Sequence, residues 1–67
     1  MLDVSDLHMV ESICQTGSIT QAAESLHISQ PTLSKRLARL EQQLGTSLFH
    51  RSARGLTPTP IANYLIE

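Results

Sequence analysis

The sequence predicts a mostly α-helical domain of the winged helix-turn-helix class: a three-helix core, a short two-stranded wing and the start of a further helix. Three observations lead to this prediction. Capping residues divide residues 3–44 into three helices, and after Gly45 the spacing of apolar residues is no longer helical. Aromatic residues make up only 3% of the 67-residue chain. A core built from aliphatic side chains suits helices packed on helices better than a β-sandwich.

The first two helices are delimited by polar caps and a glycine. Asp3 is a good N-cap for the first helix, and Gly17 is placed to end it in the left-handed conformation. A second, short helix is expected from Ser18 to about His27. Ser18 and Gln21 have the spacing of a capping box, in which each side chain contacts the other residue's backbone amide.

The third helix gives the strongest periodic pattern in the chain. Ser29 is its expected N-cap, and Pro31 lies in the first turn, where a missing N–H is harmless. A stripe of leucines follows at helical spacing and predicts a helix from about Gln30 to Gln43, closed by Gly45; the stripe consists of Leu33, Leu37, Leu40 and Leu44.

Residues after Gly45 predict a hairpin. We expect a strand at 47–51, a turn at 52–55 and a return strand at 56–57 that stops at Pro58, because proline cannot donate to a β-ladder.

A last helix is expected to follow the hairpin. Thr59 is its expected N-cap and Pro60 its first residue, and its apolar pattern is still incomplete at Glu67, so we expect the helix to continue in a longer parent protein. The predicted division is a winged helix-turn-helix domain at 1–58, with the helix-turn-helix at about 19–38 and the wing at about 46–58. A linker helix is expected to begin within 59–67.

The charges are segregated along the chain. The net charge is −1, but residues 1–28 carry four carboxylates and no lysine or arginine, whereas residues 29–60 carry five cationic side chains and one carboxylate. Such a chain can present a basic face to phosphates whatever its net charge. The alternative at this point is that the charges only solvate an ordinary surface.

Other function classes find little support. A single cysteine, Cys14, cannot form an internal disulfide and lies on the apolar stripe of the first helix, where a small buried hydrophobe is expected. His8, His27 and His50 lack the spacing of a zinc site, and no arrangement of nucleophile and base suggests an enzyme. We expect no cofactor, no signal peptide, no membrane segment and a cytoplasmic location.

Small-residue, proline and glycine positions form an ordered set of motifs at residues 17–19, 21–23, 26–34, 40–45, 48–51 and 54–57. In these motifs, in order and without gaps, essentially the whole chain closely resembles the DNA-binding domain of LysR-type transcriptional regulators. Two departures are residues 60–63, where the family usually has an Ala-Gly-Glu type of segment, and His8, where it often has arginine. The resemblance implies a bacterial, sequence-specific binder of double-stranded DNA.

Both the resemblance and helical geometry point to candidate base-reading residues. If the leucine stripe faces the core, the start of the third helix is free to enter a major groove. There glutamine can pair with adenine, lysine can donate to guanine, and proline can touch a thymine methyl. The expected base contacts are Gln30, Pro31, Ser34 and Lys35.

A second set is expected to contact the DNA backbone or minor groove. It consists of hydroxyls at helix starts and of basic side chains, which suit phosphates. The set is Ser18, Thr20, Ser29, Thr32, Arg36, Arg51 and Arg54. Arg54 would form the tip of the wing, and for Arg51 an ion pair with Glu41 is the alternative.

The resemblance further implies that the full-length protein is a homodimer or higher oligomer, joined through the helix that starts at Thr59. It would carry a C-terminal ligand-sensing domain and bind an operator with an inverted repeat. We expect this chain alone to be a monomer or a weak dimer. The alternatives are a winged helix used for protein interaction, another class of winged-helix regulator and, more distantly, an enzyme.

Overall fold

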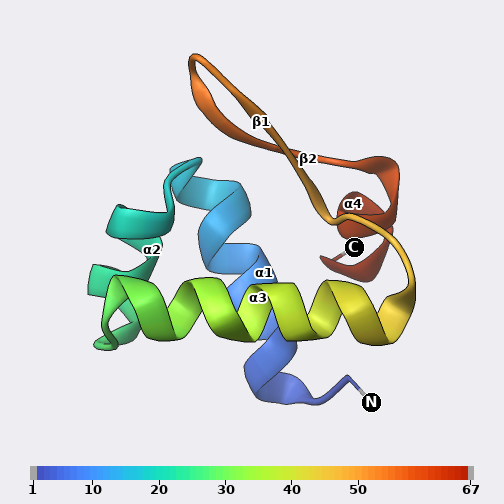
Figure 1. Ribbon diagram of the computed structural model, residues 1–67, viewed down its shortest axis with the longest axis horizontal. Coiled ribbons are helices and arrows are strands. Elements are labelled where there is room, and N and C mark those ends of the chain that lie inside the picture. Colours follow the sequence, from blue (N-terminus) through green and yellow to red (C-terminus); the bar gives the residue numbers. More distant parts are fainter. Residues whose placement is uncertain (1, 67) are drawn as a thin grey trace.

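A computed structural model of the chain describes residues 2–66. Its elements, in order, are α1 (Val4–Thr16), α2 (Ile19–Leu26), α3 (Gln30–Leu44), β1 (Phe49–Ser52), β2 (Gly55–Pro58) and α4 (Pro60–Ile66). In Figure 1, α3 runs across α1, and the β1–β2 hairpin extends away from the helices on the side of the α1–α2 turn. The predicted winged helix-turn-helix class is confirmed. Glu67, the last residue of the segment 59–67 in which the linker helix was predicted to begin, lies outside the described residues.

α1 begins and ends where the sequence predicts. The Asp3 carboxylate accepts a hydrogen bond from the Asp6 amide at 2.9 Å, and the Asp6 carboxylate accepts one from the Asp3 amide at 3.2 Å. This reciprocal pair is a capping box, and a cap of this kind stabilises a helix by about 1 kcal/mol. Gly17 ends the helix in the left-handed conformation at φ 68°.

The start of α2 corrects one prediction. The Ser18 hydroxyl accepts from the Gln21 amide at 3.2 Å, as a capping box requires, but the Ser18 amide donates to Thr16 Oγ1 at 3.3 Å and not to the Gln21 side chain. Thr16 is the last residue of α1, so its hydroxyl reaches this amide directly across the turn. α2 then ends at His27, which adopts the left-handed conformation at φ 60°.

α3 carries the predicted leucine stripe, with one exception at its end. The Ser29 hydroxyl caps the helix by accepting from the Thr32 amide, and Gly45 closes it at φ 71°. Leu33, Leu37 and Leu40 are buried. Leu44 is 37% exposed, because it is the last residue of α3 and the chain turns away at Gly45. The expectation that it completes the buried stripe is wrong.

The wing is a two-stranded antiparallel hairpin whose register runs from Phe49 opposite Pro58 to Ser52 opposite Gly55. Both strands extend closer to the tip than predicted, so the turn is two residues, 53–54, and not four. The first strand also starts later than predicted. The Leu48 amide donates to Glu41 Oε2 at 2.7 Å, which ties the approach to the strand to α3.

Thr59 does not act as the predicted side-chain cap of α4. Its carbonyl accepts from the Asn63 amide, as at a helix start, but its hydroxyl is buried and donates to the Ser47 and Leu48 carbonyls at 3.0 and 3.1 Å. The hydroxyl therefore ties the start of α4 to the segment that precedes β1. Sequence alone could not show this bond, because it joins residues that are 11 and 12 positions apart.

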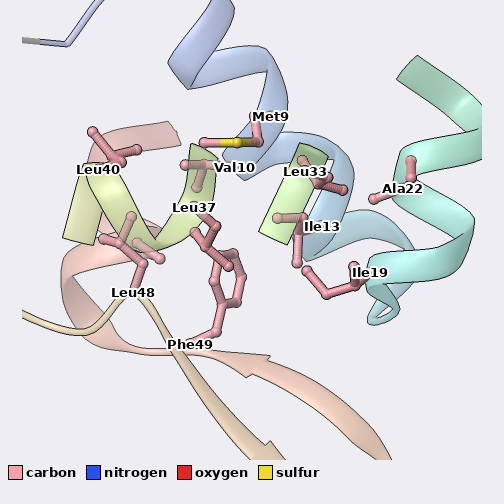
Figure 2. Packing of buried hydrophobic residues seen from close by; sticks show 12 residues of the cluster. Met9, Val10, Ile13, Ile19, Ala22, Leu33, Leu37, Leu40, Leu48 and Phe49 are labelled. Atoms are coloured by element: carbon pink, nitrogen blue, oxygen red, sulfur yellow. The ribbon is translucent and has the colours of Figure 1, made fainter. Parts of the chain in front are cut away.

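A single apolar core joins the helices to the base of the wing (Figure 2). Met9, Val10 and Ile13 come from α1, and Leu48 and Phe49 bring the start of the hairpin into the same cluster. Complete burial of one large apolar side chain contributes about 1.5–3 kcal/mol. Across the described residues, every buried side-chain nitrogen or oxygen has a hydrogen-bond partner, and none of the helices is long and apolar enough to cross a membrane.

Candidate nucleic-acid interface

The first turns of α3 present a polar surface on the side opposite the core. Gln30, Pro31, Thr32 and Lys35 are exposed, and Ser34 is half-buried. The same helix buries three of its four leucines on the opposite face, so the two faces are separated by the rotation of the helix, as the sequence predicts. All four predicted base-reading residues lie within the first two turns, but whether they contact bases stays a prediction.

A side-chain hydrogen bond joins this surface to the start of α2. Thr20 Oγ1 donates to Gln30 Oε1 at 3.1 Å, between two exposed residues of different helices. Thr20 was predicted as a phosphate contact and Gln30 as a base reader, so the structure places the two predicted sets next to each other. The hydroxyls of Ser29 and Thr32 lie 2.8 Å apart within the α3 cap itself.

A groove of about 460 Å³ separates the start of α2 from the wing. It is lined by Ser18 and Thr20 on one wall and by Arg51 and Arg54 on the other. The first amides of a helix carry partial positive charge, and arginine donates to phosphate oxygens in pairs. Four of the seven predicted backbone-contact residues thus line one groove whose chemistry suits an anion.

The wing is held against the turn between α1 and α2. The Leu56 amide donates to the Gly17 carbonyl oxygen at 3.0 Å. A Cβ on Gly55 would lie only 2.4 Å from the same oxygen, and Gly55 has φ 110°, a conformation that residues with a side chain rarely adopt. Sequence reasoning treated these two glycines only as a helix end and a turn residue, and missed that they meet.

Arg36 lies apart from the groove. Its guanidinium is 3.9 Å from the Asp6 carboxylate, a distance at which a partly exposed pair contributes little to stability. Arg36 and Asp6 border, together with Arg39, a separate hollow of about 260 Å³. Contact of Arg36 with a DNA backbone stays a prediction. The geometry supports it less than it supports backbone contacts of Arg51 and Arg54, because Arg36 lies outside the groove. Glu41, the alternative partner of Arg51, instead accepts from the Leu48 amide.

Among the residues that the structure describes, the remaining reactive side chains are not arranged as a metal site. Within residues 2–66, no group of three or more histidine, cysteine or acidic side chains is arranged to hold a metal ion. Cys14 is half-buried and packs against the core, and burial, with a smaller contribution from Glu11, raises the pKa of its thiol. A raised pKa reduces the reactive thiolate, which fits the predicted role of a small hydrophobe.

Comparisons with known proteins agree with this geometry. The family described as "Bacterial regulatory helix-turn-helix protein, lysR family" matches residues 4–63. The HTH-type transcriptional regulator YofA of Bacillus velezensis is 41% identical over 66 residues, which are 98% of this chain and 23% of that protein. The nitrogen assimilation regulatory protein nac of Escherichia coli is 51% identical over 53 residues, 79% of this chain and 17% of that protein.

Two similar solved structures are DNA complexes. The CbnR DNA-binding domain bound to DNA has a TM-score of 0.86 and 29% identity, covering 97% of this chain and 75% of that one. The BenM DNA-binding domain bound to benA site 1 DNA has a TM-score of 0.87 and 31% identity, covering 97% and 73%. The chain spans about a fifth of the length of the curated relatives it matches. It belongs to the LysR family of bacterial regulatory helix-turn-helix proteins.

Proposed function

We infer that this chain binds double-stranded DNA at specific sequences, as the DNA-binding domain of a bacterial transcription regulator, and that it catalyses no reaction. The observation that carries this proposal is the place of Thr20 between two surfaces. Thr20 is hydrogen-bonded to Gln30 at the exposed start of α3 and also lines the groove that Arg51 and Arg54 border. A helix that enters a major groove beside a basic wing needs such an arrangement.

Charge and relatives support the same proposal. The cationic residues are concentrated in α3 and the wing, although the net charge is −1. The DNA complexes of CbnR and BenM show that close structural relatives bind DNA through a domain of this shape. In the complex we propose, α3 lies in the major groove, the wing follows the adjacent backbone or minor groove, and phosphate contacts supply much of the affinity.

Salt dependence tests the phosphate contacts. Each phosphate contact that is lost reduces the slope of log affinity against log salt by about 0.9 on duplex DNA. Replacing both Arg51 and Arg54 with alanine should therefore reduce the slope by about 2, measured by fluorescence anisotropy on a duplex selected from a random library. Arg39→Ala is the matched control, because Arg39 is an exposed arginine outside the groove. An equal slope change in the control would contradict the proposed surface.

Base reading is tested at Lys35, which is exposed in the second turn of α3. Lys35→Ala should weaken binding and relax the preference at one base pair, because a lysine contact to guanine is lost. An unchanged sequence preference across a site library would refute that role. Failure of the unaltered chain to bind any duplex, at low as well as high salt, would instead favour the rival function of a protein-interaction module.

In a longer protein, we propose that two such domains are paired through a continued α4 and read an inverted repeat. Ile61 and Tyr64 of α4 are 43% and 76% exposed, so this short helix leaves apolar surface free. The chain alone should be a monomer or a weak dimer of reduced DNA affinity. A tight dimer in sedimentation at micromolar concentration would contradict this.

A further inference from the structure

The hydrogen bond between Thr20 and Gln30 bears on which base Gln30 can read, provided that the proposed DNA-binding function is correct. Thr20 lies in the first turn of α2 and Gln30 is the first residue of α3, and both side chains are exposed. Their bond is 3.1 Å long, from the threonine hydroxyl to the glutamine carbonyl oxygen Oε1. It therefore ties a candidate base reader to the neighbouring helix before any DNA is present.

The direction of this bond decides which atoms of Gln30 remain available. A glutamine side chain has one oxygen with two accepting lone pairs and one NH₂ group with two donor hydrogens. The bond occupies one lone pair and turns Oε1 toward Thr20, so the donor nitrogen Nε2 is the group presented to a base. The start of α2 favours this orientation over the flipped one, because the positive end of a helix attracts a carbonyl oxygen more than an NH₂ group.

We propose that Thr20 is a positioning residue that makes Gln30 read its base pair as a hydrogen-bond donor. In the major groove, guanine presents only acceptors, N7 and O6, and thymine presents the acceptor O4. Adenine presents an acceptor beside a donor, and a glutamine pairs with both only when its oxygen and its nitrogen both face the base edge. Because thymine is always paired with adenine, the contrast lies between base pairs. Gln30 favours a G·C pair, contacted at guanine, over an A·T pair, which revises the adenine pairing expected from the sequence.

The experiment compares site selection from a randomised duplex library by the unaltered chain and by Thr20→Val, Thr20→Ser and Gln30→Ala. Valine keeps the shape of threonine without the hydroxyl, and serine keeps the hydroxyl. The pair read by Gln30 is the pair whose preference Gln30→Ala removes. A good base contact discriminates by roughly 5- to 150-fold, and loss of one hydrogen bond changes a ratio by roughly 2- to 10-fold.

The unaltered chain should select a G·C pair over an A·T pair at that position. Thr20→Val should reduce this preference by roughly 2- to 10-fold, with the preference at other positions unchanged, and Thr20→Ser should restore it. Selection of an A·T pair by the unaltered chain would overturn the proposal. So would an equal loss of affinity for all sequences in Thr20→Val, because that is the signature of a phosphate contact. If the unaltered chain selects no sequence at all, the proposed function itself has failed.

Discussion

The close approach of Gly55 to Gly17 predicts that Gly55→Ala loosens the wing. The new Cβ would lie 2.4 Å from a backbone oxygen, so either the hairpin or the α1–α2 turn must shift. A shift of the hairpin weakens the hydrogen bond from the Leu56 amide, which contributes about 0.5–1.5 kcal/mol. The positive φ of 110° adds strain of about 1–3 kcal/mol for a residue with a side chain. Together these costs are about 2–4 kcal/mol.

Gly45→Ala is the matched control for this variant. Gly45 also has a positive φ, 71°, but a Cβ there meets no atom within 4 Å. It should cost about 1–2 kcal/mol from backbone strain alone. Since 1 kcal/mol shifts the Tm of a domain this small by about 4–8 °C, Gly55→Ala should melt about 5–15 °C below Gly45→Ala in a circular dichroism experiment. Equal melting temperatures would refute the reasoning that contact between the wing and Gly17 holds the hairpin in place.

Three further predictions concern the core and the thiol. In urea denaturation, Leu33→Ala should lower the free energy of unfolding by about 2–5 kcal/mol and Leu44→Ala by less than about 1 kcal/mol. The reason is that Leu33 is fully buried whereas Leu44 is 37% exposed, and equal losses of stability would contradict this difference in burial. Glu41→Ala should lower the free energy of unfolding by about 1–3 kcal/mol, because the amide of the buried Leu48 loses its acceptor, and an unchanged urea midpoint would show that this bond contributes nothing. Cys14 should react with a thiol reagent more slowly in the folded chain than in urea at the same pH, because burial raises the pKa of its thiol; equal rates of labelling would contradict this. The free energy of unfolding should also fall as the pH rises above the pKa of the unfolded thiol, because the unfolded chain loses this proton first.

Local signals in the sequence predicted the helices well. N-caps such as Asp3 and Ser29 act on amides two or three residues away, and Gly45 ends its helix through its own backbone, so neighbouring residues are sufficient to place these ends. The exposed polar face of α3 follows from the same logic, because helical rotation alone separates it from the leucines. These features gave the fold class and the candidate base-reading residues without tertiary information.

The features that sequence reasoning missed all depend on contacts between distant residues. The Thr59 hydroxyl could have capped α4 locally, but the packed chain offers it two carbonyl acceptors near β1. Strand ends depend on register, which the turn sequence did not reveal, and so the hairpin turn was predicted two residues too long. Gly17 and Gly55 each had a sufficient local explanation, which hid the fact that the Gly17 carbonyl oxygen leaves no room for a Cβ on Gly55.

The two contacts that connect the elements of the proposed interface differ in how firmly they are fixed. The wing is held to the α1–α2 turn by a backbone hydrogen bond and by a contact that admits no Cβ, so its position is set before DNA binds. The Thr20–Gln30 bond joins two exposed side chains, and water competes for it. Substitutions at the first contact should therefore change affinity for all sequences through the wing arginines. Substitutions at the second should change which base pair is preferred while leaving the contacts of the wing arginines intact, so affinity and specificity can be altered separately in this domain.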